Sequence, residues 1–216
     1  MTIQDYGLIA QALGSLLLLG GYVPQIVKLH KTRNPTGISA LFWLMIAIGC
    51  TLILVNMSIQ DAPIEVQITQ LLNVIGAWYT ISIVMYYRWK RSISTDISAK
   101  LIAIGLLISW IMLYYVQFAD ERNIGYAFQT IGTIALLTAY IPQIIYLYKL
   151  KDATGVSRWL YVILGSGLLL VTFNMIVTGT SSEIIFTEFV NIGLIMTQYV
   201  LTVHYQNQKL YKGINN

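Results

Sequence analysis

Polar side chains recur on one face of two long apolar stretches of this sequence. In chain order they are Gln70, Asn73, Thr80, Glu188, Asn191 and Gln198. Within each stretch, their spacing places them on the same face of a helix. Asn and Gln amides carry donors and an acceptor, so such a face could bind hydroxyl, carboxylate or amide groups of a small polar solute. The alternative is that these side chains hydrogen-bond one helix to another.

Glu188 is the acidic residue that lies well inside an apolar stretch. Burying an ionised carboxylate costs several kcal/mol, so we expect Glu188 to be protonated, paired or hydrated. A carboxyl group of this kind is a candidate for proton coupling, because it could bind a proton in one state and release it in another. The equivalent position in the first stretch is the neutral Gln70. A solvated acid in a wet vestibule is the alternative.

Two further pairs, Asn56-Met57 and Asn174-Met175, repeat along the chain in the same way. They lie nearer the outer ends of their apolar stretches. Their amides could contact the solute, and Met side chains can pack on a ring. A structural or interfacial role for these asparagines stays open beside the solute-binding one.

A Pro-Gln pair also occurs twice, as Pro24-Gln25 and Pro142-Gln143. Proline lacks an amide hydrogen and clashes with the carbonyl four residues earlier, so each helix is predicted to kink. Gln25 or Gln143 could hydrogen-bond a carbonyl freed in this way. The same kink in two places predicts a hinge, with two static kinks as the alternative.

The stretches that carry these residues are long enough to cross a membrane. The chain has 216 residues, of which 56% are hydrophobic and only 10% charged, too few charges for a soluble surface of this size. Several of its apolar blocks reach the roughly 20 residues that span a bilayer. They cover residues 6–29, 37–58, 64–87, 97–118, 124–148, 156–177 and 184–205. We therefore predict an all-α integral membrane protein with seven transmembrane helices.

Basic residues set the orientation of these seven spans. All Lys and Arg residues except Arg122 fall on one side of the scheme. Basic loops stay in the cytoplasm, so we predict an N-terminus outside and a C-terminus in the cytoplasm. This placement also explains the net charge of +4 without a nucleic-acid partner. Cys50 is the single cysteine, which excludes a disulfide framework or a thiolate metal site, and we expect neither metal nor cofactor.

The chain contains an internal repeat. A shift of 118 residues, which aligns 6–85 with 124–203 without gaps, superimposes Asn73 on Asn191 and each Pro-Gln pair on the other. We predict a first three-helix repeat over 1–92, a linker helix within 93–121 and a second three-helix repeat over 122–216. The single linker helix restores the direction of the chain, so the two three-helix bundles are predicted to be parallel, in a 3+1+3 arrangement.

The duplicated segments resemble the PQ-loop superfamily, which includes SWEET and SemiSWEET sugar carriers, cystinosin and related lysosomal amino-acid carriers. The segments that carry the resemblance are 22–26 with 35–39 and 140–144 with 153–157. The resemblance implies alternating access, in which two bundles rock about a central site and the prolines act as hinges.

The same resemblance bears on the substrate. Sugar-carrying members have an Asn in the third helix of a unit, which Asn73 and Asn191 match, and often a Trp about four turns earlier. Met57 and Met175 stand at those Trp places here, which weakens the sugar interpretation. Amino-acid members keep both Pro-Gln pairs and use an intramembrane acid for proton coupling, a role that Glu188 could fill.

We therefore expect a carrier of a small polar solute, with an amino-acid-type substrate ahead of a sugar and proton coupling open. A SWEET-like sugar uniporter is the alternative. An alternative of another class is a cargo or ligand receptor, because the KDEL receptor resembles this fold. An enzyme is not expected. The bilayer and the solute are the expected partners, homo-oligomerisation is left open, and a bacterial inner (plasma) membrane is the expected location.

Overall fold

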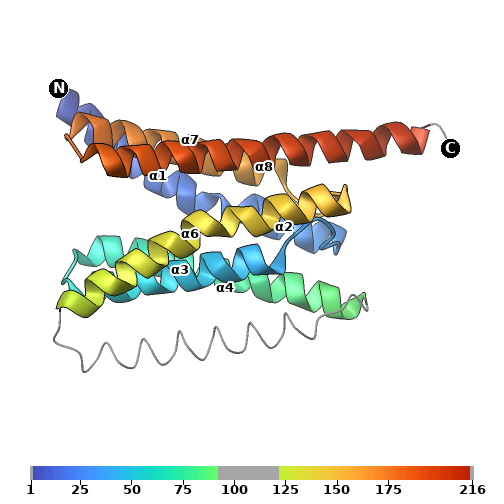
Figure 1. Cartoon of the computed structure of the whole chain (residues 1–216), viewed down its shortest axis with the longest axis horizontal. Coiled ribbons are helices and arrows are strands. Elements are labelled where there is room, and N and C mark those ends of the chain that lie inside the picture. The colour runs from blue at the N-terminus through green and yellow to red at the C-terminus, as the bar shows by residue number, and fades with distance from the viewer. Residues whose placement is uncertain (1, 92–121, 215–216) are drawn as a thin grey trace. The chain divides into compact units, whose positions relative to one another are not determined.

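The computed structural model describes residues 2–91 and 122–214, and these residues form helices and no strand (Figure 1). The helices are α1 (Ile3–Gly20), α2 (Tyr22–Thr32), α3 (Ala40–Ile59), α4 (Ile64–Lys90), α6 (Arg122–Leu150), α7 (Arg158–Val177) and α8 (Ser182–Ile214). The predicted linker helix at 97–118 falls outside the described residues.

Six helical segments of the described chain are long and apolar enough to cross a membrane. They are Ile3–Thr32, Ala40–Ile59, Val66–Lys90, Ile124–Leu150, Arg158–Val177 and Ile184–Leu210. Each coincides with a span expected from the sequence. The described residues are thus helical without strands, and their six long apolar segments are consistent with an integral membrane protein.

The backbone repeats with the same period as the sequence. Arg33 and Lys151, which are 118 residues apart, both adopt the left-handed conformation, with φ of 49° and 52°. Asp61 and Gly179 form a second such pair, with φ of 51° and 72°. A left-handed residue is a common way for the chain to leave a helix. Helices that are equivalent in sequence therefore end in the same manner.

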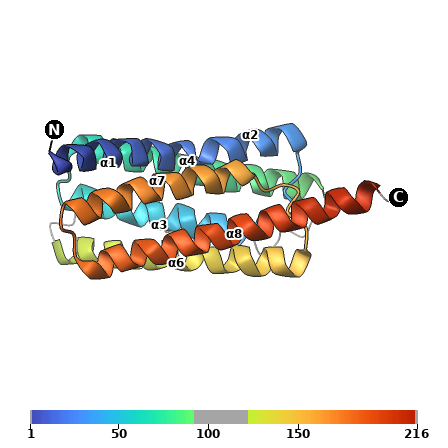
Figure 2. The same ribbon diagram turned by 90° about the horizontal axis from the view of Figure 1, so that it is seen from above.

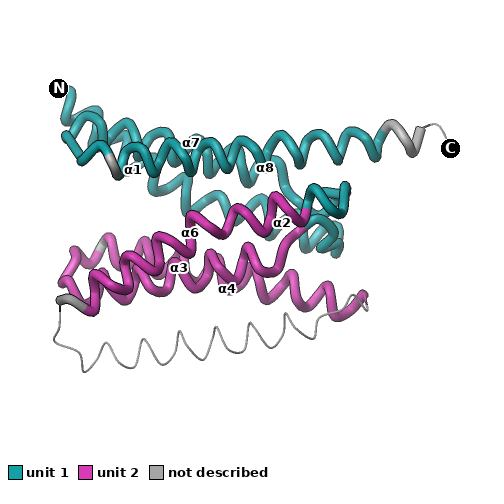
Figure 3. Tube along the Cα trace, in the orientation of Figure 1, with its two compact units in different colours: residues 1–37, 147–216 teal, residues 38–146 magenta. Residues whose placement is uncertain are grey.

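The chain folds into two compact units, which Figure 3 colours separately. Unit 1 comprises residues 1–37 and 147–216, and so holds α1, α2, α7 and α8. Unit 2 comprises residues 38–146 and holds α3, α4 and almost all of α6. Each unit thus joins the first helix of one predicted repeat to the second and third helices of the other. The units cut across the predicted boundaries 1–92 and 122–216, which stay a description of the sequence duplication.

Unit 1 is built around α7, which packs against both α1 and α8 (Figure 2). The contact between α1 and α7 is close because glycines face each other. A Cβ added to Gly14 would lie 2.8 Å from the carbonyl oxygen of Gly167, and a Cβ on Gly167 would lie 2.9 Å from that of Gly14. Small residues let two membrane helices approach closely enough for backbone contact.

Unit 2 repeats this packing with the equivalent glycines. A Cβ on Gly49 of α3 would lie 3.0 Å from the carbonyl oxygen of Gly132 in α6, and the reverse distance is also 3.0 Å. Helix α3 packs against α4 on another side. The two units therefore share one design, in which a second helix lies between a first and a third helix.

Candidate functional site

Each Pro-Gln glutamine is buried and holds a loop of the other repeat. Gln25 is 1% exposed, donates from Nε2 to the Gly155 carbonyl at 3.0 Å and accepts from the Ser157 amide at 2.8 Å. Gln143 is also 1% exposed and accepts from the Ser39 amide at 2.8 Å. Such buried hydrogen bonds stabilise the contact, because removing the amide would leave buried backbone groups without a hydrogen-bond partner. Each glutamine thus anchors the loop that enters the second helix of its own unit.

These hydrogen bonds differ from the suggestion that Gln25 would bind a carbonyl freed within its own helix. The effect of the two prolines on the helices also differs between the copies. The first helix divides into α1 and α2 at Gly21, three residues before Pro24. Helix α6 runs through Pro142 without a break. The hinge role of the prolines stays a prediction.

The loop that each glutamine anchors is also held by a cation. In unit 2, Arg88 is 8% exposed and donates to the Ile38 carbonyl at 2.9 Å and to the Tyr146 hydroxyl at 3.0 Å. In unit 1, Lys28 donates to the Val156 carbonyl at 2.6 Å, and Gln206 donates to the same oxygen at 2.7 Å. Because Ile38 and Val156 are equivalent under the repeat, both units anchor the same carbonyl.

The residues that form these anchors differ in type between the two copies. Arg88 of the third helix corresponds to Gln206, and Tyr146 of the first helix corresponds to Lys28. The cation therefore comes from the third helix in unit 2 and from the first helix in unit 1. The sequence analysis missed these anchors, because the 118-residue shift shows only that residue types differ at these positions and not which carbonyl they contact.

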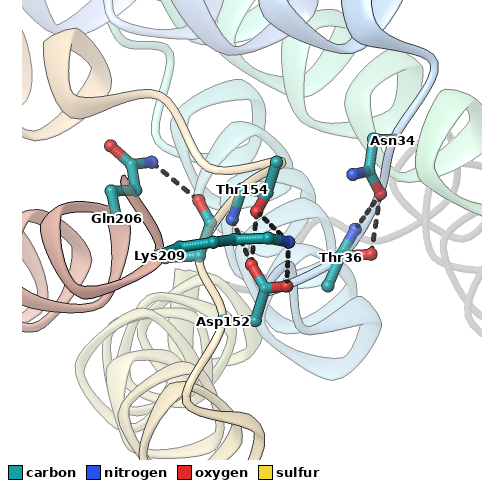
Figure 4. Close-up of polar contacts among 7 residues, drawn as sticks. Asn34, Thr36, Asp152, Thr154, Gln206 and Lys209 are labelled. Carbon is teal, nitrogen blue, oxygen red and sulfur yellow. Dashed lines mark hydrogen bonds and ion pairs between the residues drawn. The ribbon is translucent and has the colours of Figure 1, made fainter. Parts of the chain in front are cut away.

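The two loops themselves fold as matching turns (Figure 4). Asn34 accepts hydrogen bonds from the amide and hydroxyl of Thr36, and Asp152 does the same for Thr154. Lys209 of α8 adds an ion pair of 2.7 Å to Asp152. Partial burial raises the pKa of Asp152, but the hydrogen bonds from Lys209 and Thr154 outweigh burial and hold it below its usual value.

In each unit, the asparagine predicted to bind solute hydrogen-bonds a polar side chain one turn earlier in its own helix. In unit 2, Asn73 donates to Gln70 at 3.4 Å, and Gln70 donates to the Cys50 carbonyl at 2.9 Å. In unit 1, the equivalent Asn191 donates to Glu188 at 3.1 Å. Asn73, Gln70, Asn191 and Glu188 are half-buried. The Asn191 Oδ1 atom is buried and has no hydrogen-bond partner among the described residues.

The remaining members of the two polar faces are more buried than the four residues above. Thr80 and Gln198 are fully buried, and the Thr80 hydroxyl donates to the Gly76 carbonyl within its own helix. Asn73 belongs to unit 2 and Asn191 to unit 1. That the two faces share one cavity therefore stays a prediction.

Asn56 and Asn174 link helices within their units. Asn56 donates to Gln129 at 3.0 Å in unit 2, and Asn174 donates to the equivalent Gln11 at 3.2 Å in unit 1. Each Asn Oδ1 atom lies against a glycine of the first helix, Gly125 or Gly7. These contacts support the structural role considered for the asparagines. Their contact with a solute stays a prediction, as does that of the neighbouring half-buried Met57 and Met175.

A comparison with protein families bears on the whole arrangement. The model described as the PQ loop repeat matches residues 6–66 and 124–184, which together exceed half of the chain. This protein belongs to the PQ-loop family. The two matched segments each hold one Pro-Gln pair and the loop that follows it, so the family resemblance inferred from the sequence is confirmed. A comparison with curated proteins found no match, and neither did a comparison with solved structures.

Membership in the family gives the duplicated anchors their context. The family indicates a transporter-type role in a membrane rather than an enzymatic one. Two kinds of side chain, a buried glutamine and a cation, bind the loop that precedes the second helix of each unit. A side-chain turn lies in each loop, and unit 1 adds the ion pair between Asp152 and Lys209. The half-buried amides and the carboxyl group of Glu188 lie in the N-terminal half of the third helix of each unit.

Proposed function

We propose that this PQ-loop protein carries a small polar solute across its membrane by alternating access, with an amino-acid-type substrate and a proton as the coupling ion. The single observation that carries the proposal is the Glu188–Asn191 pair in the apolar helix α8. A carboxyl group within a membrane span is energetically costly, and such groups commonly mark solute or ion paths. The pair offers an acid for a proton and a buried amide oxygen that could accept a hydrogen bond from a substrate ammonium group.

The equivalent Gln70–Asn73 pair of unit 2 differs chemically from the Glu188–Asn191 pair of unit 1. It supplies amide groups without a titratable partner, so proton binding falls to Glu188 alone. In the proposed cycle, the anchors of Gln25 and Gln143 hold one state, and motion at Pro24 and Pro142 releases them. The N-terminus lies outside and the C-terminus in the cytoplasm in this scheme, and the membrane is a bacterial inner membrane.

Uptake into proteoliposomes tests this proposal. Labelled amino acids and sugars are offered with and without an inward proton gradient. The gradient is expected to raise amino-acid uptake by wild-type protein and to have no effect on Glu188→Gln. The matched control is Asp61→Asn, which makes the same carboxyl-to-amide change in the exposed turn after α3.

Other outcomes assign the protein differently. Sugar uptake that is insensitive to the gradient would make it a sugar uniporter. Binding of a solute or peptide without any uptake would favour the receptor function. A Glu188→Gln protein that keeps the wild-type response to the gradient would remove Glu188 as the coupling site.

A further inference from the structure

Two cavities adjoin in unit 1 and share the side chain of Lys28. The larger, of about 450 Å³, is lined mainly by apolar side chains of α2 and α7, with Lys28 and Lys31 among its walls. The smaller, of about 260 Å³, has the basic residues Lys28, Arg158 and Lys209 among its walls. One region of unit 1 therefore combines an apolar cavity with a group of cationic side chains.

The apolar cavity has the lining that a hydrocarbon chain requires. Its walls include Val23, Pro24, Val27, Trp159 and Ile163. Trp159 is 66% exposed and Val23 is 56% exposed, so the lining is open on one side. A soluble anion would gain nothing from these side chains, whereas an acyl chain would bury apolar surface against them.

The cations beside this cavity have hydrogen-bond donors to offer a phosphate. A lysine ammonium has three donors, and Lys28 uses one on the Val156 carbonyl. Arg158 donates through Nε to Gln206 and through Nη2 to Asn207, which leaves part of its guanidinium for another acceptor. Among Lys28, Arg158 and Lys209, only Lys209 has an ion pair with a carboxylate in the described chain. The group therefore carries uncompensated positive charge.

We propose that unit 1 binds an anionic phospholipid. Its acyl chain lies in the larger cavity along α2 and α7, and its phosphate lies at Lys28 and Lys31, with Arg158 adding charge from the neighbouring cavity. The lipid would contact Pro24 and Ser157, which flank the Gln25 anchor on either side. Its binding would therefore stabilise the anchored state of this loop.

The equivalent region of unit 2 lacks this combination. Tyr146 stands in place of Lys28, and Ala40 in place of Arg158. The nearby Arg88 is buried and stacks its guanidinium 5.4 Å from the ring centre of Tyr146. Lys28 and Lys31 are the two lysines proposed to bind the phosphate. Under the 118-residue shift, only Lys31 aligns with another lysine, which is Lys149. The lipid site is thus specific to unit 1, and Lys149 provides a matched control.

Quenching of Trp159 fluorescence tests this site in the full-length protein. The protein is reconstituted with phospholipids that carry brominated acyl chains, either phosphatidylglycerol or phosphatidylcholine. The Trp159 signal is the difference between wild type and Trp159→Phe. Phosphatidylglycerol is expected to quench this signal at lower mole fraction than phosphatidylcholine. Lys31→Gln should weaken that preference about fivefold, as expected for one basic residue near an anionic headgroup.

Controls separate the site from general charge and from loss of fold. Lys149→Gln, which removes an exposed lysine from the last turn of α6, should keep the wild-type preference. Lys28→Gln should weaken the preference at least as much as Lys31→Gln, while an unchanged elution profile confirms that the variant is folded. Equal quenching by the two lipids, or a preference that survives in Lys31→Gln and Lys28→Gln, would overturn the proposal. So would loss of the preference on addition of inorganic phosphate at constant ionic strength, since the site would then bind a soluble anion.

Discussion

Unit 1 and unit 2 solve the same structural problem with different residues. Both must hold the loop that enters their second helix, and both use a buried glutamine together with a cation on one equivalent carbonyl. In unit 2 the cation is the enclosed Arg88. In unit 1 it is Lys28, which shares the carbonyl with Gln206 and lies beside two cavities. The duplicated fold thus preserves the anchored atom while the residues that anchor it have diverged.

This difference separates a closed structural anchor from one that is accessible to other molecules. Arg88 is shielded by Tyr146, so its charge serves the fold of unit 2. The charges of unit 1 exceed what the anchor requires, because Gln206 alone could satisfy the Val156 carbonyl. The same unit also holds the carboxyl group of Glu188, where unit 2 has the neutral Gln70.

The largest expected effect comes from removing a Pro-Gln glutamine. Gln25→Ala leaves the Gly155 carbonyl and the Ser157 amide without their buried partner, which should lower the free energy of unfolding by about 3 kcal/mol. Unit 1 joins the first helix of one repeat to the second and third helices of the other. The backbone amide that loses its partner therefore lies in the second repeat, although Gln25 lies in the first. Hydrogen–deuterium exchange should therefore accelerate at Ser157, whose amide Gln25 binds.

The companion variant makes this prediction specific. Gln143→Ala should instead accelerate exchange at Ser39, whose amide Gln143 binds. Both measurements are made where each variant remains folded. Acceleration at Ser39 in Gln25→Ala, with Ser157 unaffected, would show that each glutamine holds its own repeat and that the exchange of first helices is wrong.

A smaller effect is expected from the two anchoring cations, and it should be unequal. Arg88→Met removes a buried charged donor from the Ile38 carbonyl and should cost about 2 kcal/mol of stability. Lys28→Met should cost less than about 1 kcal/mol, because Gln206 still donates to the Val156 carbonyl. Thermal unfolding in detergent measures both. Equal losses, or a greater loss for Lys28→Met, would contradict the redundancy of the unit 1 anchor.

The smallest effect concerns the ion pair of unit 1. The pKa of Asp152 lies below its usual value in the folded protein, so its pair with Lys209 contributes stability at pH values above the unfolded pKa, near 4. That contribution should disappear as the pH falls through the lower, folded pKa. Because the pair is partly exposed, the contribution should stay within about 0.5 kcal/mol.

Asp152→Asn isolates this contribution, since Asn34 forms the equivalent turn without a charge. The variant should unfold at nearly the wild-type temperature at a pH below the folded pKa of Asp152, and slightly earlier at pH 7. Stability measurements at these two pH values check the difference. If the variant and the wild type differ in stability by the same amount at both pH values, the ion pair contributes nothing.

The sequence was sufficient for the features that depend on periodicity. Six of the predicted spans, the duplicated Pro-Gln segments and the family follow from apolar length and from a single shift of 118 residues. The contact between Asn191 and Glu188 also follows, because residues three apart share a helical face. Local spacing determines each of these features.

Features that depend on which helices meet could not be read in this way. The exchange of first helices is set by contacts between distant segments, such as Gln25 with Ser157, and a repeat gives equal support to pairing within or between its copies. The partner of Gln25 was missed for the same reason. The shared carbonyl anchors were also missed, because Arg88 and Lys28 are unequal in type and occupy different helices of the repeat.

The most direct test of the account is solute uptake by Asn73→Ala and Asn191→Ala in proteoliposomes, with folded, inserted protein quantified for each variant. These residues are the equivalent amides of unit 2 and unit 1. If both serve one transported solute, each substitution should abolish uptake while leaving the protein folded in the membrane. Normal uptake in both variants would contradict the assignment of these residues to solute binding.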